Sequence, residues 1–379
     1  MKHFSYWETK YFMPFWDVAI IGSGITGLTT AVHLKKRFPE RKIAVLERGA
    51  LPSGASTKNA GFACFGSVSE ILSDLENMSE NEVFELIEKR YRGLKKLREL
   101  LGDDNIDYRP TGGFELFRKD ETETYERCLG SLGYINAELV QVIGKQAFRD
   151  AGDRISEFGF GDVGQMLINN LEGCIDTGKM MKNLVALSRE NGVEIFNGIE
   201  VNEFTDSGDR CILETNTGKI LTRQVVVATN GFARKLIPEL NVEPCRGQVL
   251  ITNRLTNLKF DGCFHYNEGF DYFRNIDGRI LLGGGRNLNE AAETTTEEGV
   301  TDQIQDHLEE LLREVIIPGQ SFQVEMRWSG IMGIGDKKTV IMKKISDRVH
   351  CVCRLSGMGV ALGTALGEKM AEMIGAEIT

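Results

Sequence analysis

The chain alternates short, continuously apolar runs with longer segments in which apolar residues recur at helical spacing. Two apolar runs, Asp17–Ile21 and Lys42–Leu46, flank the segment Ile25–Phe38, whose apolar positions are three or four residues apart. Such runs are typical of buried strands, and the intervening pattern is typical of an amphipathic helix. Because a helical crossover joins parallel strands, the pattern predicts a strand–turn–helix–strand unit of a parallel sheet.

The same two patterns continue along the rest of the chain. Residues 71–101, rich in Glu, Lys and Leu, indicate long helices, and Thr177–Glu190 indicates an amphipathic helix. The segment Glu243–Val340 is mostly strand-like, with a turn at Asp277–Gly278 and one helix over Thr301–Val315. Further strands are predicted over 107–109, 112–118, 193–196, 198–204, 211–215, 219–221, 224–228 and 349–354, and a closing helix over about 361–374.

A chain of 379 residues exceeds one compact core, so the length indicates two domains or one large domain with an insertion. Buried strands at 224–228 and 349–354 are expected to rejoin the first parallel unit. The parallel-sheet domain is therefore expected to comprise residues 1–105, 165–235 and 345–379. A second, sheet-based domain is expected to comprise residues 106–164 and 236–344.

Composition narrows the class of protein. Hydrophobic residues make up 41% of the chain and charged residues 26%, values ordinary for a soluble globular protein. The net charge of −10, without a basic block, argues against nucleic-acid or anionic-membrane partners. No run approaches the roughly 20 apolar residues of a membrane-spanning helix. Met1–Trp16 lacks the pattern of a signal peptide, and the eight cysteines have no metal-site spacing, so we expect reduced thiols, no metal and a cytoplasmic location.

The strongest chemical signal is the turn Gly22–Gly27 (Gly-Ser-Gly-Ile-Thr-Gly), which follows a predicted strand and opens a predicted helix. Gly22 permits the tight turn, Gly24 lets a pyrophosphate approach the main chain, and Gly27 allows close helix–strand packing. Amides at the helix N-terminus stabilise the phosphate charge. Glu47, at the end of the next strand, is expected to accept hydrogen bonds from a ribose. The motif predicts a dinucleotide but does not separate NAD from FAD.

A loop of small and hydroxyl residues, Ser53–Gly61, is suited to wrap closely around a phosphate group.

Further motifs occur along the chain in a fixed order. They are Ser5–Glu8, Glu47–Arg48, Ala228–Gly231, Arg246–Gln248, Leu282–Gly285, Trp328–Gly330 with Asp336, and Gly357–Gly359. Together these motifs resemble the D-amino-acid-oxidase-like FAD-dependent oxidoreductases, the group that includes glycine oxidase, sarcosine oxidase and the gamma-glutamylputrescine oxidoreductases. The resemblance extends from about residue 5 to the end of the sequence.

The resemblance implies an α/β fold: a Rossmann-like FAD-binding domain with an inserted antiparallel-sheet substrate domain. It implies non-covalent FAD and removal of a hydride from the amine-bearing carbon of an amine, amino acid or N-substituted amino acid, which gives an imine. The implied FAD-binding residues are Gly22, Gly24, Ile25, Thr26, Gly27, Glu47, Arg48, Ser56, Thr57, Lys58, Asn59, Ala60, Gly61, Val201, Ala228, Thr229, Asn230, Gly231, Gly357, Met358, Gly359, Val360 and Ala361.

The substrate anchor departs from the family pattern. In glycine-oxidase-like members an arginine after the Trp-x-Gly segment binds the substrate carboxylate, whereas the matching position here is Met332. Methionine cannot replace a bidentate guanidinium. The substrate or oxygen contacts that we consider instead are Lys58, Tyr272 and Arg286, with Arg274 and His265 as further candidates; His265 is expected to be structural.

Two other functions are considered beside amine oxidation. One is an FAD- or NAD-dependent dehydrogenase of a hydroxy acid, and the other is a non-catalytic flavin-binding protein. For the amine oxidoreductase, the expected partners are a small amine or amino acid and an electron acceptor, either oxygen or an unknown carrier.

Overall fold

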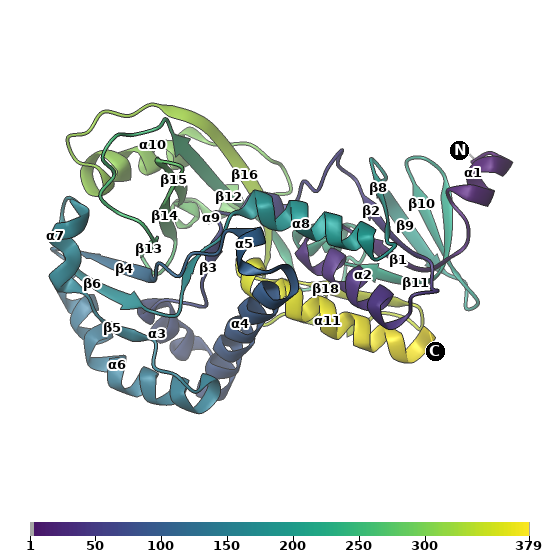
Figure 1. Ribbon diagram of the computed structural model, residues 1–379, viewed down its shortest axis with the longest axis horizontal. Helices are drawn as coiled ribbons and strands as arrows, with labels where there is room; N and C mark the ends of the chain where they lie inside the picture. Colours follow the sequence, from purple (N-terminus) through teal and green to yellow (C-terminus); the bar gives the residue numbers. More distant parts are fainter. Residues whose placement is uncertain (1–3, 379) are drawn as a thin grey trace.

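Residues 4–378 are described by the structure, a computed structural model, and they form two sheets of eight strands each and one of two strands. Figure 1 shows the two large sheets in separate lobes, with α4 and α5 at the junction between the lobes. The expectation for Met1–Trp16 falls partly on residues 1–3, outside the described residues. Within that segment, α1 (Tyr6–Tyr11) begins at Ser5, whose side chain and that of Glu8 form a capping box.

The first sheet has the strand order β17-β18-β11-β1-β2-β8, and β10 and β9 extend it from β11. Its central pairs, from β18 through β11, β1 and β2 to β8, are parallel. The strands are β1 (Trp16–Ile21), β2 (Ile43–Glu47), β8 (Glu194–Asn197), β9 (Val201–Asp206), β10 (Cys211–Thr215), β11 (Lys219–Val227), β17 (Ile341–Lys344) and β18 (Val349–Cys353). The expected parallel sheet, assembled from distant segments of the chain, is therefore present.

Both faces of this sheet are buried, which explains the continuous apolar runs in its strands. Val18 and Ile20 face a core shared with the helices, whereas Ala19 and Ile21 face a core shared with β9 and β10. The helices of this lobe are α2 (Ile25–Arg37), α4 (Glu80–Leu101), α8 (Thr177–Glu190) and α11 (Gly359–Ile378). Helix α2 packs against both α11 and α8, and α4 also packs against α11.

The second sheet has the order β16-β12-β15-β14-β13-β4-β6-β5. Its pairs are antiparallel except for β13 and β4, which are parallel. The strands are β4 (Gly113–Arg118), β5 (Phe148–Asp150), β6 (Val163–Asn169), β12 (Glu243–Thr252), β13 (Cys263–Tyr266), β14 (Asp271–Ile276), β15 (Arg279–Gly284) and β16 (Val324–Ile334). The boundary expected between residues 164 and 165 falls inside β6.

The second sheet buries one face against a core of Phe, Ile and Leu side chains. Stacked and edge-to-face pairs join Phe114, Phe158, Phe160, Phe260, Phe264 and Phe273 in that core. The remaining α-helices and strands are α3 (Val68–Asn77), α5 (Asp103–Ile106), α6 (Thr122–Ile143), α7 (Ile155–Phe158), α9 (Glu290–Glu293), α10 (Asp302–Leu311), β3 (Phe62–Ala63) and β7 (Gly173–Cys174).

Several predicted elements need correction. The long helix α6 was not predicted, although its buried residues Cys128, Ile135 and Leu139 have helical spacing. Residues 107–109 form no strand; Arg109 makes a single bridge to Cys174. The segments 219–221 and 224–228 were predicted as two strands, but they lie almost entirely in one strand, β11. None of the helices in residues 4–378 is both long and apolar enough to cross a membrane.

Candidate functional site

A cavity of about 660 Å³ lies between the two large sheets, within the range of about 300–1,000 Å³ that is usual for small-molecule sites. On the first sheet it follows the carboxyl ends of the parallel strands, where ligands of α/β folds bind. The lining residues there are Gly22–Thr26 after β1, Glu47–Arg48 at β2, Ala228–Asn230 after β11 and Gly357–Ala361 after β18. Strands β12 to β16 of the second sheet line the opposite wall.

The turn after β1 leaves no room for a side chain at Gly22 or Gly27. Gly22 has a φ of +106°, and a Cβ there would lie 2.8 Å from the carbonyl oxygen of Ala228. A Cβ on Gly27 would lie 2.0 Å from the carbonyl oxygen of Gly22. The turn can therefore form, and α2 can approach β1, only because these positions are glycine.

Two helices begin at the cavity. The first main-chain hydrogen bond of α2 runs from the Leu28 amide to the Gly24 carbonyl, and that of α11 runs from the Leu362 amide to the Met358 carbonyl. The amides before these positions have no partner within their own helix. The Ile25 amide instead donates to Ser56 Oγ at 3.1 Å. Two helix N-termini thus direct partial positive charge at one cavity, as an anionic ligand requires.

Glu47 is buried at the end of β2, with 6% of its surface exposed. Its Oε2 accepts hydrogen bonds from Ser23 Oγ at 2.5 Å and from the Ser23 amide at 3.3 Å. Its Oε1 accepts from the Gly49 amide at 2.8 Å and from Ser53 Oγ at 3.3 Å. The carboxylate is therefore held in one orientation at the edge of the cavity.

Two buried hydroxyls on the cavity wall, Thr229 Oγ1 and Ser356 Oγ, have no hydrogen-bond partner in the described residues. An unsatisfied buried group costs about 1–3 kcal/mol, so such groups are uncommon in folded proteins. Their position on one cavity is consistent with a polar ligand that completes them.

The second-sheet wall carries the aromatic and polar side chains. Tyr272 packs edge-to-face on Phe62 with ring centroids 5.7 Å apart, and burial raises the pKa of its hydroxyl to about 12. Arg286 lies over the ring of Phe270 at 4.9 Å. Burial alone would lower the pKa of His265, but Glu172, whose Oε2 is 3.7 Å from Nε2, and other nearby carboxylates outweigh burial and raise the pKa.

Charged groups on α3 line one end of the cavity. Lys338 Nζ lies 3.1 Å from a Glu70 oxygen and 2.7 Å from an Asp74 oxygen, and Arg90 lies 3.2 Å from Glu70. Burial opposes ionisation of Glu70, but the two cations outweigh it and lower the pKa to about 2. For Asp74 burial outweighs Lys338, and the pKa is raised.

A comparison with protein families decides which class this cavity belongs to. Residues 17–373 match the model of the DAO family, described as FAD dependent oxidoreductase. The chain belongs to the DAO family of FAD-dependent oxidoreductases. This finding confirms the expected family and selects FAD rather than NAD as the cofactor.

Curated relatives match the DAO-family chain over most of its length. Gamma-glutamylputrescine oxidoreductase of Escherichia coli (strain K12) is 23% identical over 94% of this chain and 83% of its own length. Sarcosine oxidase subunit beta of Rhodobacter capsulatus is 21% identical over 99% of this chain and 89% of its own length. The function expected from the sequence, FAD-dependent oxidation at an amine-bearing carbon, is confirmed at the level of this family.

Solved structures confirm the expected fold class. Glycine oxidase from Bacillus cereus superimposes with a TM-score of 0.77 at 18% identity, covering 96% of this chain and 95% of that chain. L-proline dehydrogenase from P. horikoshii superimposes with a TM-score of 0.76 at 18% identity, covering 97% and 95%.

The cavity of this DAO-family enzyme fits FAD in its polar features. The glycine turn and the α2 N-terminus suit a pyrophosphate, Glu47 suits a ribose, and the unpartnered Thr229 and Ser356 hydroxyls lie on the same wall. Arg48, beside Glu47, lies over the ring of Phe232 at 3.9 Å. The N-terminus of α11 provides a second site for negative charge.

Most residues implied as FAD contacts line the cavity, but Gly27, Thr57, Gly61 and Gly231 do not. These four residues are neighbours in the chain of residues that line the cavity. Thr57 donates to the carbonyls of Pro52 and Gly54. A Cβ on Gly231 would lie 2.3 Å from the Met332 carbonyl oxygen. Their small size or local hydrogen bonds therefore serve packing.

The candidate substrate anchors divide in the same way. Lys58, Tyr272, Arg286 and His265 line the cavity. Arg274 does not, because its guanidinium is buried and donates to the carbonyls of Ala60, Gly61 and Ile175. Arg274 thus serves the scaffold, whereas His265, expected to be structural, reaches the cavity.

Sequence reasoning missed part of the wall. Ser23 could have been found, since it lies between two motif glycines. Gly247 and Asp336 belong to motifs that the sequence showed, but they were not expected at the cavity. The others come from segments without a motif, and only tertiary packing places them here. They include Glu70, Ser73, Asp74 and Asn77 on α3, Ile199 and Glu200 before β9, Phe232, Val249 on β12, Glu268–Phe270, Lys337 and Lys338.

Proposed function

We propose that this DAO-family enzyme holds FAD non-covalently in the cavity and oxidises a small amine or N-substituted amino acid that enters from the side of the second sheet. One observation carries the proposal. A single cavity connects the glycine turn and two helix N-termini on one wall with Tyr272, His265 and Arg286 on the other. A dinucleotide on the first wall would therefore share its space with a ligand on the second.

The residues proposed to hold FAD are those of the expected set that line the cavity. Ile25 and Thr26 would direct their amides at the pyrophosphate, Glu47 would accept from the ribose, and Gly359–Ala361 would face the flavin ring. FAD held by these residues would supply the hydride acceptor for the oxidation. The chain's own groups bind, orient and exclude water.

The substrate side lacks an arginine at position 332. A Cβ on Gly247 would lie 3.2 Å from Met332 Cε, and a Cβ on Gly357 would lie 3.7 Å from Met332 Sδ, so this side chain forms an apolar wall between the two sheets. A substrate carboxylate would instead meet the guanidinium of Arg286. We therefore propose a substrate with an apolar group beside Met332 and any anionic group directed towards Arg286.

The proposal is tested with the purified protein under anaerobic conditions. We expect a yellow protein with one FAD, whose visible absorbance bleaches on addition of a secondary or primary amine from a panel that also contains amino acids and hydroxy acids. Admission of air then reports the acceptor: rapid recovery of colour indicates oxygen, and slow recovery indicates a carrier. Bleaching by hydroxy acids alone would overturn the amine assignment, and a colourless protein that takes up no FAD would overturn the proposal.

A further inference from the structure

Lys58, a cation on the cavity wall, is held from the opposite sheet. It follows the short helix Ala55–Thr57, and its carbonyl accepts a hydrogen bond from Trp328 Nε1 at 3.0 Å. A Cβ on Gly330 would lie 3.1 Å from Lys58 Cβ, so the glycine allows this close contact. The Lys58 ammonium forms an ion pair with Glu298, although the two residues belong to different lobes.

The segment that carries Glu298 is fastened on both sides of this residue. The Glu297 amide donates to Thr295 Oγ1 at 3.1 Å, and the Gly299 amide donates to Ser329 Oγ on β16 at 2.9 Å. Two residues further on, the Thr301 amide donates to the side chain of Gln248 on β12 at 3.0 Å. The main chain around Glu298 is therefore attached to two strands of the second sheet.

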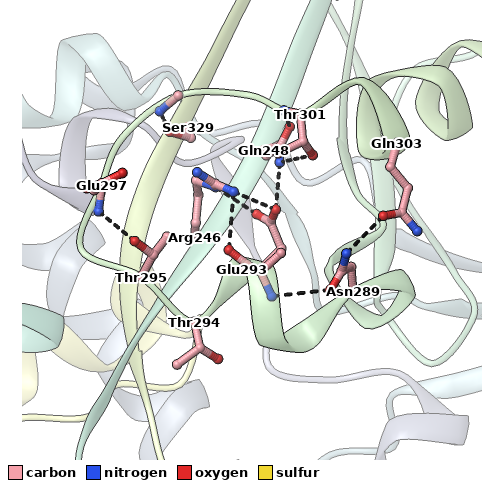
Figure 2. Close-up of polar contacts among 12 residues, drawn as sticks. Arg246, Gln248, Asn289, Glu293, Thr294, Thr295, Glu297, Thr301, Gln303 and Ser329 are labelled. Atoms are coloured by element: carbon pink, nitrogen blue, oxygen red, sulfur yellow. Dashed lines mark hydrogen bonds and ion pairs between the residues drawn. The ribbon is translucent and has the colours of Figure 1, made fainter.

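A buried ion pair fixes the start of the same segment. Arg246 Nε and Nη2 donate to Glu293 at 2.9 and 2.8 Å, and Gln248 Nε2 donates to Glu293 Oε1 at 2.9 Å. Figure 2 shows Arg246 and Gln248 directed together at the Glu293 carboxylate. The two charged side chains are 10% and 1% exposed. A buried pair with its hydrogen bonds complete favours one arrangement over others.

Arg246 and Glu293 do not line the cavity, so this buried ion pair does not contact a ligand there. The segment that the pair holds is connected to the cavity wall through Glu298, which pairs with Lys58. Glu298 is about half exposed, so the pair by itself would contribute little to stability. Its geometry is nevertheless defined, because Lys58 is held through its carbonyl and Glu298 through its neighbours.

We propose that Glu298 is the positioning residue of Lys58. Its carboxylate fixes the ammonium at the cavity wall and offsets part of the positive charge there. The inference rests on the proposed function, since it takes Lys58 to lie beside the bound flavin. Removal of the Glu298 charge would leave the Lys58 charge uncompensated and would favour the reduced, more negative flavin.

The test compares the FAD-loaded wild type with Glu298→Gln, Lys58→Met, the double variant and Glu297→Gln. Glu297→Gln removes the same charge one residue away. The measurement is the ratio of reduced to oxidised flavin at a fixed poise of a reference dye, at low salt. We expect Glu298→Gln to raise this ratio about fivefold, which corresponds to the upper end of the interaction free energies of partly exposed ion pairs. Glu297→Gln should change the ratio less than about twofold.

The double variant separates positioning from a simple charge effect. If Glu298 acts through Lys58, its substitution in the Lys58→Met background changes the ratio less than about twofold. Equal effects of Glu298→Gln and Glu297→Gln, or an undiminished effect of Glu298→Gln without Lys58, would overturn the inference. The FAD content of the wild type is measured first, because absence of flavin there refutes the proposed function, whereas normal flavin with unresponsive variants refutes only the positioning role.

Discussion

The two walls of the cavity are built from different chemistry. The first-sheet wall is largely main chain, in which glycines and helix amides follow the ends of parallel strands and Glu47 provides an acidic side chain. The wall formed by the second sheet and α3 depends on side chains, many of them charged and paired, such as Glu70 with Lys338. The first wall is therefore sensitive to added atoms, and the second is sensitive to the loss of a charged partner.

The largest effect is expected behind the second-sheet wall. Glu293→Gln leaves the buried Arg246 guanidinium without its counter-charge, so the free energy of unfolding should fall by about 3–5 kcal/mol. Chemical denaturation measures the change. The matched control is Glu325→Gln, which removes a more exposed partner of Arg279 in the same sheet and should cost no more than about 1 kcal/mol. Equal losses would contradict the contrast between buried and exposed pairs.

The charged groups on α3 predict acid sensitivity. The pKa of Glu70 is lowered from 4.5 to about 2, so the unfolded chain binds more protons than the folded one between these values. The stability from ionised Glu70 is complete above about pH 4.5 and is lost as the pH falls towards 2, a difference of about 3 kcal/mol.

Glu70→Gln should remove this part of the pH dependence. The unfolding free energies of wild type and variant, measured by urea titration at several pH values, should differ most above pH 4.5 and converge near pH 2. A gap that stays constant across this window would show that Glu70 is not the group responsible.

The main-chain wall is tested by adding one methyl group. Gly27→Ala places a Cβ against the Gly22 carbonyl, so α2 must move away from β1 at a cost of about 1–3 kcal/mol and FAD retention should fall. Gly130→Ala on α6 is the matched control, because a Cβ there meets nothing within 4 Å and should stabilise the helix by up to about 1 kcal/mol. Thermal unfolding and flavin content distinguish the two outcomes.

The smallest expected effect concerns the acidic side chain of the first wall. Glu47→Ala should raise the dissociation constant of FAD about tenfold, equivalent to about 1.4 kcal/mol, because charge-assisted hydrogen bonds to the ribose are lost. Equilibrium dialysis of the apoprotein measures the change. Glu203→Ala, on the exposed face of β9, should leave the constant unaltered. Unchanged affinity in Glu47→Ala would remove the ribose assignment.

The same contrast explains what could be predicted from the sequence. The first wall could be predicted, because Gly22, Gly24 and Gly27 act through local conformation and lie beside the strand that they follow. The second wall could be predicted only in part. Tyr272, His265 and Arg286 are sequence candidates that line it, whereas the ion pair of Lys58 with Glu298 forms only through the packing of two lobes. Helix α6 was missed since Gly130 and Gly133, which face open space, interrupt its helical pattern.

Strand β18 and the start of α11 complete the first-sheet wall of the cavity from residues 349–361, far along the chain from the glycine turn. During synthesis on the ribosome, a nascent chain that already contains the turn still lacks this wall. If FAD binds as proposed, it can be retained only after these residues have left the exit tunnel. Cofactor loading would then be a late event in biogenesis, and premature termination before residue 349 would yield a colourless product.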